Sequence, residues 1–264
     1  MKDFKIYNNL FSQLHYRFEM KTFVIAEIGS NWEGSVKKAE KIIKECKKAG
    51  ADAVKFQMWR ANDLYKKSHP NWNEISKSQL TFDKAKKIKN IAKKHNIEFF
   101  CSVFFPESID FLESLGIKKF KVASRTCLEK DPFSKKTLTR LSTSNKKKFI
   151  SMGMGGNKKR ISKIFKRKPP VFFYCISEYP LQFKKINWDK AIEYDGFSDH
   201  TEGIIAPILY TMMKKKNGSK LIYVEKHVKL KNSKGPDAST SIDTEMLTEL
   251  VLNIRNIEKI KFSN

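Results

Sequence analysis

The stretch that most constrains the fold is residues 23–57, which read FVIAEIGSNWEGSVKKAEKIIKECKKAGADAVKFQ. An apolar run at its start is followed by Gly29, and apolar residues then recur at helical spacing from Val36 until Gly50 ends the pattern. A second apolar run, residues 53–56, follows at once. Two strands joined by a helix of this length are typical of a parallel βαβ unit. The sequence therefore predicts a parallel sheet.

Charged and polar side chains stand near the end of both predicted strands. Side chains alternate between the two faces of a strand, so Ile25 and Glu27 share one face of the first strand. Lys55 and Gln57 share one face of the second strand in the same way. An unpaired charge in a buried strand is costly. The pattern is typical of a site at the C-terminal ends of the strands of a parallel barrel.

The alternation of strand and helix continues along the chain. Further strands are expected at residues 98–101, 119–122, 148–150, 171–176, 196–198 and 221–224. Helices are expected at residues 79–95, 106–116, 158–166, 188–194 and 204–213, and two more start after caps at Asp131 and Asp243. A long segment, residues 58–78, is interpreted either as a substrate cover or as a packed aromatic segment.

Eight strands, each followed by a helix, predict a single α/β domain, a (βα)8 TIM barrel. We expect the barrel over residues 23–264, after an N-terminal extension over residues 1–22 to which the sequence assigns no structure. An open doubly wound sheet is the alternative. It is disfavoured because polar residues recur at every strand end, whereas a doubly wound sheet concentrates them at one switch point.

Composition narrows the function classes. The chain has 264 residues, of which 53 are Lys or Arg and 28 are Asp or Glu, for a net charge of +25. Most of the excess is Lys on the outer faces of predicted helices without an aromatic and Arg stripe, which favours a solvated surface over specific nucleic-acid binding. No segment resembles a membrane span or a secretory signal. The four cysteines show no C-x-x-C spacing and are expected as reduced core thiols of a cytoplasmic protein.

The predicted strand ends bring lysines, hydroxyls and carboxylates to one rim. The polar residues at these ends are Glu27, Lys55, Gln57, Ser102, Lys121, Ser124, Ser151, Ser198, His200, Glu225 and His227. Lys supplies a point charge and Ser supplies hydrogen-bond donors, a combination that suits phosphate oxygens. The rim is therefore interpreted as an anion-binding site.

His200 and His227 end neighbouring strands of the predicted barrel. Backbones of neighbouring strands lie about 4.8 Å apart, so two imidazoles placed there can share one metal ion. The ligand set is too small for a closed structural zinc site. We expect an open metal site in which the metal polarises a carbonyl group. An anion site beside such a metal indicates a phosphorylated small molecule that reacts with a carbonyl compound.

Eight short motifs resemble those of a known family. The motifs are AEIGSNWEG, GADAVKFQ, FKVAS, SMGMGG, SEYP, FSDHTEG, VEKH and GPD, in this order. Their order and spacing closely resemble the sialic acid synthase family, which makes N-acetylneuraminate, legionaminate and pseudaminate from phosphoenolpyruvate. The resemblance covers about residues 23–258 and implies a barrel of the predicted type.

The resemblance implies roles for the rim residues. It implies that a divalent metal, Mn2+ or Mg2+, is held by His200 and His227. The phosphoenolpyruvate contacts that it implies are Lys55, Ser102, Lys121, Ser124, Ser151 and Ser198. The sugar contacts that it implies are Glu27, Gln57, Tyr179 and Asp237, with Glu27 also an acid or base. The expected catalytic residues are Glu27, Lys55, Lys121 and His200.

The implied reaction joins C3 of phosphoenolpyruvate to the aldehyde carbon of an N-acylated amino sugar. Water then adds at C2, and phosphate leaves by C–O cleavage. The expected partners are these two small molecules, and the family's assembly suggests a homodimer. The resemblance thus predicts a C–C bond-forming transferase of nonulosonate biosynthesis for surface polysaccharides or flagellin sugars.

Four features depart from the family pattern. Trp32 replaces the His of the usual N-H-x-G motif, and Thr126 stands at the place of a carboxylate that binds the amino sugar in neuraminate-forming members. Ser177 replaces the Asn of N-x-Y-P, a form associated with members that act on other nonulosonate precursors. The chain stops at Asn264, where most members continue into a small antifreeze-like domain that supplies an Arg to the partner's sugar pocket.

Two further hypotheses belong to other function classes. A degenerate barrel that serves as a non-catalytic binding or scaffold partner is consistent with Trp32 and the missing domain, and it predicts that His200→Ala leaves the biological role intact. Nucleic-acid binding through the basic surface predicts tight binding with a steep dependence on salt.

Overall fold

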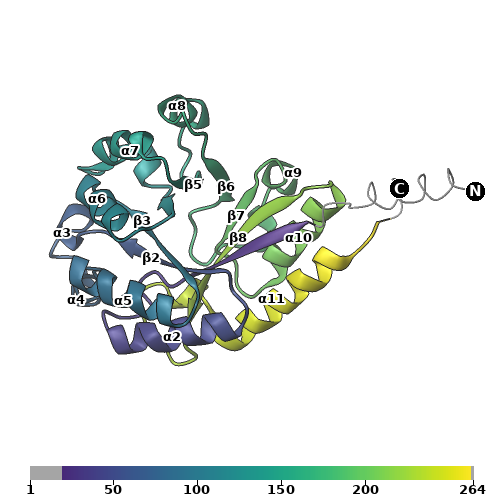
Figure 1. Cartoon of the computed structure of the whole chain (residues 1–264), viewed down its shortest axis with the longest axis horizontal. Helices are drawn as coiled ribbons and strands as arrows, with labels where there is room; N and C mark the ends of the chain where they lie inside the picture. Colours follow the sequence, from purple (N-terminus) through teal and green to yellow (C-terminus); the bar gives the residue numbers. More distant parts are fainter. Residues whose placement is uncertain (1–19, 263–264) are drawn as a thin grey trace, which may run out of the picture.

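The computed structural model describes residues 20–262. Parallel strands pair in sequence order, and β1 (Lys21–Glu27) also pairs with β8 (Leu221–Lys229), which closes the sheet into an eight-stranded barrel (Figure 1). This confirms the predicted TIM barrel, and the open-sheet alternative is wrong because an open sheet leaves its outer strands unpaired. Of the extension expected over residues 1–22, residues 1–19 lie outside the described part, and Lys21 and Thr22 belong to β1.

All the predicted strands are present, most of them longer than expected. The other barrel strands are β2 (Ala53–Met58), β3 (Glu98–Val103), β4 (Lys119–Val122), β5 (Lys147–Ser151), β6 (Val171–Cys175) and β7 (Gly196–Asp199). A short strand that the sequence did not indicate, β9 (Ile242–Asp243), pairs with the end of β8. The predicted end of β8 at Val224 is wrong, so Glu225 and His227 lie inside this strand rather than after it.

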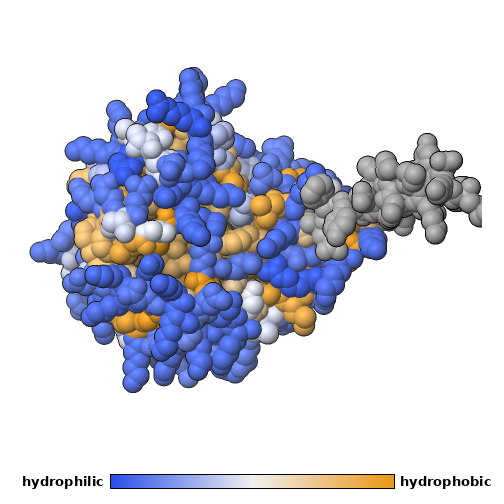
Figure 2. Space-filling model, in the orientation of Figure 1, coloured by the Kyte–Doolittle hydropathy of each residue, from blue (hydrophilic) through white to orange (hydrophobic). Residues whose placement is uncertain are grey.

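Helices surround the barrel and bury one face each. Those between or after the strands are α2 (Val36–Lys48), α5 (Phe82–Lys94), α6 (Pro106–Ser114), α7 (Ser134–Thr143), α8 (Lys158–Ile164), α9 (Trp188–Ala191), α10 (Ile205–Lys216) and α11 (Thr244–Lys259). In α2, the Ser35 hydroxyl caps the first turn, Ile42 and Ile43 are buried, and Lys41 and Lys44 are exposed. The face of the molecule seen in Figure 2 is mostly hydrophilic.

Two predictions about connecting segments need correction or detail. Asp131 does not cap the fourth major helix, because its carboxylate binds Arg125 and α7 begins only at Ser134. The segment 58–78 contains two short helices, α3 (Ala61–Leu64) and α4 (Trp72–Lys77).

The barrel interior has an aromatic layer beneath a polar one. The rings of Phe100 and Phe173 pack against Phe149 with centroids 5.8 and 5.3 Å away, and Tyr223 packs against Phe149 at 4.8 Å. Gly196 leaves room for this layer, because a Cβ there would lie 2.3 Å from the Phe173 ring. Since side chains alternate, residues two positions further along these strands point into the same interior. These residues are Ser102, Ser151, Cys175, Ser198 and Glu225.

The structure bears on two expectations drawn from composition, one about the cysteines and one about membrane-spanning segments. All four cysteines are free and buried, which confirms that they are thiols of the interior. Within residues 20–262, no helix combines the length and the hydrophobicity that crossing a bilayer requires.

Candidate active site

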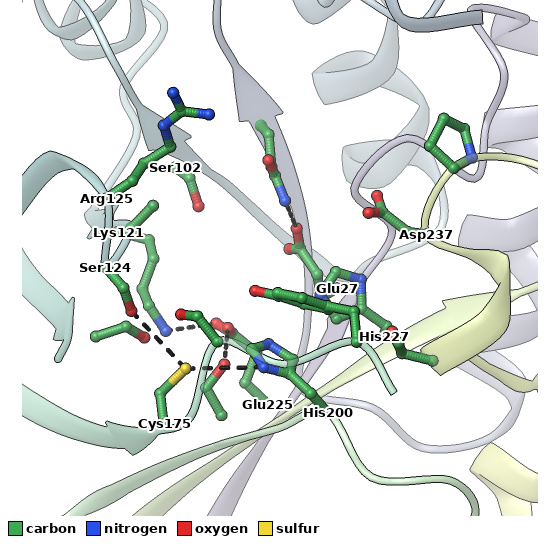
Figure 3. A pocket seen from close by; sticks show the side chains of 18 of the residues that line it. Glu27, Ser102, Lys121, Ser124, Arg125, Cys175, His200, Glu225, His227 and Asp237 are labelled. Carbon is green, nitrogen blue, oxygen red and sulfur yellow. Dashed lines mark hydrogen bonds and ion pairs between the residues drawn. The ribbon is translucent and has the colours of Figure 1, made fainter. Parts of the chain in front are cut away.

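A cavity of about 480 Å³ opens among the residues at the C-terminal ends of the strands (Figure 3). Every residue that the sequence analysis assigned to the site lines this cavity. These residues are Glu27, Lys55, Gln57, Ser102, Lys121, Ser124, Ser151, Tyr179, Ser198, His200, His227 and Asp237. Their convergence follows from the closed parallel barrel, which brings the ends of all its strands to one mouth.

Two lysines meet at one buried carboxylate. Lys121 Nζ lies 2.8 Å from Glu225 Oε2, and Lys55 Nζ lies 3.8 Å from the same oxygen. Ser198 Oγ donates a hydrogen bond of 2.7 Å to the other oxygen of Glu225. Burial disfavours the charged form of Glu225, but Lys121 and Lys55 outweigh it and lower its pKa to about 2. Glu225 is therefore a carboxylate whenever the protein is folded near neutral pH.

Glu27 has a much higher pKa than Glu225, although both carboxyl groups lie at the same mouth. Its carboxylate lies 2.6 Å from Lys55 Nζ and accepts a hydrogen bond of 2.7 Å from Gln57 Nε2. Burial raises the pKa of Glu27 to about 7, because it outweighs the attraction of Lys55. Glu27 can thus hold or release a proton near neutral pH, which is what an acid or base group requires.

The serine hydroxyls are arranged around the lysines. Lys55 Nζ donates to Ser102 Oγ at 2.7 Å, which leaves the hydroxyl proton free to be donated elsewhere. Ser124 Oγ accepts a hydrogen bond of 2.8 Å from the backbone N–H of Gly153. Ser151 ends β5 on the same wall of the cavity. Together they provide the donors and charges that an anion needs.

His200 and His227 lie side by side, with ring centroids 5.5 Å apart. His200 Nδ1 lies 2.7 Å from the carbonyl oxygen of Ile176, and because that oxygen only accepts, Nδ1 carries the proton and Nε2 is left as the basic nitrogen. Burial lowers the pKa of His227 to about 4, so this imidazole is neutral near pH 7. The Tyr179 ring covers His200 at a centroid distance of 4.2 Å.

This donor set fits an open metal site. Both imidazoles are buried, and His227 Nδ1 has no hydrogen-bond partner in the structure. In residues 20–262, no group of three or more His, Cys, Asp or Glu side chains is arranged to hold a metal ion. Two imidazoles therefore match a metal that takes its other ligands from water or substrate, and they do not match a closed structural site.

Asp237 reaches the cavity from the loop after β8, and hydrogen bonds hold this loop against the loop after β1. Its Oδ2 accepts hydrogen bonds of 2.7 Å from both the backbone N–H and the hydroxyl of Ser30. Asn31 Nδ2 donates to the carbonyl oxygen of Val228 and to Ser241 Oγ, at 3.0 and 2.8 Å. Gly29 allows the close approach, because a Cβ there would lie 2.4 Å from Asp237 Oδ2. The two loops thus hold Asp237 in a fixed position.

The structure adds cavity residues to which the sequence analysis gave no role. Glu225 was recognised only as a rim residue, and its alternation with Tyr223 and His227 was the signal for its inward position. Cys175 and Arg125 also line the cavity. Tyr65, His69 and Asn71 line it from the segment 58–78, so part of that segment borders the cavity while Trp59 is buried against Tyr65.

Two of the departures from the family pattern, Trp32 and Thr126, are buried and do not belong to the described cavity lining. Trp32 is 1% exposed, and its ring packs against Phe56 with centroids 6.2 Å apart. Thr126 is buried too, and neither residue is among the described residues that line the cavity. Ser177 does line it. Of these three substitutions, only Ser177 therefore changes the described cavity wall directly.

Comparison with protein families decides the relationship. The NeuB family model matches residues 42–263, most of the chain. The chain belongs to the NeuB family. This result confirms the resemblance drawn from the motifs.

Relatives of this NeuB chain are named as synthases. It is 32% identical over 268 residues to the N,N'-diacetyllegionaminic acid synthase of Campylobacter jejuni, with 90% of this chain and 77% of that protein covered. It is 30% identical over 263 residues to the N-acetylneuraminate-9-phosphate synthase of Mus musculus, with 90% and 70% covered. The solved N-acetylneuraminic acid synthetase of Leptospira borgpetersenii has a TM-score of 0.79 and 25% identity, with 90% and 84% covered. These likenesses support a general function as a sialic acid or nonulosonate synthase.

Proposed function

We propose that this NeuB family member condenses phosphoenolpyruvate with the aldehyde form of an N-acylated amino sugar and releases phosphate. The observation that supports this most is that Lys55, Lys121, the four predicted serines and the imidazoles of His200 and His227 all line one cavity. Phosphoenolpyruvate carries a carboxylate and a phosphate, which match the lysines and hydroxyls. The relatives named as synthases of N,N'-diacetyllegionaminic acid and N-acetylneuraminate 9-phosphate support a sugar as the second substrate.

In this proposal, Lys55 and Lys121 hold the anionic groups of phosphoenolpyruvate, and Ser102, Ser124, Ser151 and Ser198 orient them. C3 of phosphoenolpyruvate attacks the aldehyde carbon, so a C–C bond forms and the aldehyde oxygen takes up a proton. Water then adds at C2. The bond between C2 and the bridging oxygen breaks, and this oxygen leaves as part of the phosphate.

Glu27 is the proposed proton donor to the aldehyde oxygen. Its pKa of about 7 keeps a proton on a substantial fraction of the molecules at neutral pH. Gln57 and Lys55 fix its carboxylate. Asp237 and Tyr179 are the proposed contacts for the sugar, because both line the cavity on the side of the histidines.

His200 and His227 are the residues proposed to hold Mn2+ or Mg2+. When bound, the metal supplies Lewis-acid polarisation of a carbonyl oxygen. Titration of the protein with Mn2+ tests the site by itself. We expect His227→Gln to weaken Mn2+ binding and His95→Gln, at a half-buried histidine outside the described cavity lining, to leave it unchanged.

The proposed reaction is tested by mixing the protein with Mn2+, phosphoenolpyruvate and a panel of 2-acetamido and 2,4-diacetamido hexoses. Phosphate release that depends on a sugar, with a product containing both carbon skeletons, is the expected result. Phosphoenolpyruvate labelled with 18O at the bridging oxygen should deliver that label to phosphate, because the C–O bond breaks. Label retained in the sugar product contradicts this mechanism.

The same assay separates catalysis from a scaffold role. His200→Ala should abolish phosphate release if the barrel is a catalyst. Wild-type protein that binds Mn2+ and phosphoenolpyruvate but releases no phosphate with any sugar favours the non-catalytic alternative. A cytoplasmic site for the reaction is also proposed, and the four free, buried cysteines support it.

A further inference from the structure

We propose that Arg125 is the binding group for the phosphate of phosphoenolpyruvate, a third cation beyond Lys55 and Lys121. This assignment rests on the proposed function and extends it to a residue outside the predicted site. Arg125 follows Ser124 in the loop after β4 and lines the cavity. Its side chain is 33% exposed, so a ligand in the cavity has access to it.

The two buried lysines share one carboxylate, Glu225, and Lys55 also lies beside Glu27. Lys55 lies 2.6 Å from Glu27 and 3.8 Å from Glu225, and Lys121 lies 2.8 Å from Glu225. Phosphoenolpyruvate brings a carboxylate together with a phosphate, which alone carries a charge of about −1.5 to −2. A ligand with two anionic groups gains from further hydrogen-bond donors, and a guanidinium keeps free N–H groups even when it is paired with a carboxylate. Of the Lys and Arg residues that the structure describes in the cavity lining, Arg125 is the only one besides these two lysines.

The guanidinium of Arg125 is held in place by a partner outside the cavity lining. Asp131 accepts hydrogen bonds from Nε at 2.8 Å and from Nη2 at 2.7 Å. This two-point contact fixes the plane of the guanidinium, and Nη1 takes no part in it. The Tyr65 ring lies 5.7 Å from the guanidinium carbon and covers it from the segment 58–78. A fixed guanidinium with donors to spare suits a phosphate better than a flexible lysine does.

The position of Arg125 favours the phosphate over the amino sugar. Figure 3 shows Arg125 with Lys121, Ser102 and Ser124 on one side of the cavity, and Asp237 and His227 on the other. The lysines and Ser198 lie deep beside Glu225, where a carboxylate fits. Arg125 lies on the same side of the cavity as Ser102 and Ser124, so we assign it to the remaining anionic group, the phosphate.

The test separates the two anionic groups of phosphoenolpyruvate by using one competitor that has only the carboxylate and one that is only the phosphate. Pyruvate and inorganic phosphate are each used as competitors of phosphoenolpyruvate in the phosphate-release assay, and direct titration with phosphoenolpyruvate gives its dissociation constant. For Arg125→Met we expect the dissociation constant of phosphoenolpyruvate and the inhibition constant of phosphate to rise about 10- to 100-fold. The inhibition constant of pyruvate and the KM of the amino sugar should stay within about twofold of the wild-type values.

Three further variants make the result specific. Arg125→Lys keeps the charge but loses the fork and should restore only part of the affinity. Asp131→Asn should weaken phosphate binding less than Arg125→Met does, because it loosens the guanidinium without removing it. Arg140→Met is the matched control, since Arg140 binds Asp110 and Glu113 through a similar paired contact away from the cavity.

The outcomes separate this inference from the proposed function. If Arg125→Met raises the KM of the amino sugar and not the inhibition constant of phosphate, Arg125 belongs to the sugar and the inference is wrong. Equal weakening of pyruvate and phosphate also overturns it. If the wild-type protein binds no phosphoenolpyruvate and releases no phosphate, the proposed function fails first.

Discussion

Strands β7 and β8 carry buried charged or polar residues on both sides of the sheet, and these belong to two separate clusters. Ser198 and Asp199 of β7 pair in register with Glu225 and Lys226 of β8. Ser198 and Glu225 point into the barrel mouth, where Glu225 binds Lys121. Asp199 and Lys226 point the other way and bind each other at 2.6 Å, with both side chains fully buried. A shift of one residue along each strand thus separates two charged clusters.

The difference between them shows what each cluster does. The outward pair is closed, because Asp199 accepts from the N–H and hydroxyl of Thr201 and Lys226 also contacts the Thr201 carbonyl oxygen. The inward cluster is open to the cavity and includes Glu27, whose pKa is raised to about 7 by burial. A closed pair that excludes ligands contributes only to the fold, whereas an open one can exchange its partners for a substrate.

The largest effect is expected from breaking the closed pair. Lys226→Met leaves Asp199 buried without its countercharge, so we expect the free energy of unfolding to fall by about 3–5 kcal/mol. Urea denaturation measures the change. The double variant Lys226→Met with Asp199→Leu removes both charges and should regain much of this loss. A single variant as stable as the wild type contradicts a structural role for this pair.

The second prediction breaks the open cluster. Lys121→Met should reduce kcat/KM for phosphoenolpyruvate by about 100-fold or more, because it removes a charge from the proposed anion site. It should destabilise the protein less than Lys226→Met does, since the freed Glu225 keeps Lys55 and Ser198 and borders the cavity. Kinetics and denaturation of the two variants together give the comparison. A Lys121 variant that loses stability but keeps activity reverses the assignment.

The third prediction uses pH to detect the open cluster. The pKa of Glu27 is about 7 in the folded protein, against 4.5 for an ordinary solvated glutamate, so the folded protein keeps a proton that the unfolded chain loses between these values. Stability contributed by Glu27 should therefore fall as pH rises through this interval, by about 2–3 kcal/mol between pH 5 and 8. Glu27→Gln does not titrate, so its stability should vary less over this range.

The comparison with Glu27→Gln cancels an opposing contribution. Burial lowers the pKa of His227 to about 4, so its neutral form adds stability as pH rises from about 4 to 6.5 in both proteins. Glu225, with a pKa lowered to about 2, loses its contribution only below this range. The measurement is the difference in unfolding free energy between wild type and Glu27→Gln at pH 5 and at pH 8. A difference that stays constant means that Glu27 does not carry the raised pKa.

Much of this arrangement could be predicted from the sequence. The repeated βαβ pattern required parallel strands, and parallel strands in a barrel bring their ends to one mouth. Period-two alternation placed Glu27 and Lys55 inside, and the motifs added Tyr179 and Asp237 from loops that periodicity does not reach. Residue identity and strand parity were therefore enough to name the charged and hydroxyl side chains that the strands bring to the cavity, but not Arg125 or the lining residues of the segment 58–78.

What could not be predicted depends on contacts between distant residues. The Asp131-Pro132 pair fits a helix cap locally, but Asp131 binds Arg125 instead, and no local rule weighs one partner against the other. The protonation of Glu27 and Glu225 is set by burial and by lysines from other strands, so the two carboxylates could not be distinguished in sequence. The burial of Trp32 against Phe56 likewise needed the packed barrel.

The smallest effects are expected from removing a single hydroxyl from each cluster, and they test whether the open cluster serves catalysis and the closed one stability. Ser198→Ala and Thr201→Val each remove one hydroxyl that donates to a buried carboxylate, Glu225 at 2.7 Å or Asp199 at 3.1 Å. We expect Ser198→Ala to lower kcat/KM for phosphoenolpyruvate by about 10-fold with little change in stability, and Thr201→Val to cost about 1–2 kcal/mol of stability with little change in kcat/KM. Glu225 borders the cavity, so water or substrate can donate a hydrogen bond to it in place of Ser198. Asp199 is fully buried with Lys226, so no water or substrate can replace the hydroxyl of Thr201. Equal effects of the two variants on both measurements show instead that the sheet does not separate catalysis from stability at this point.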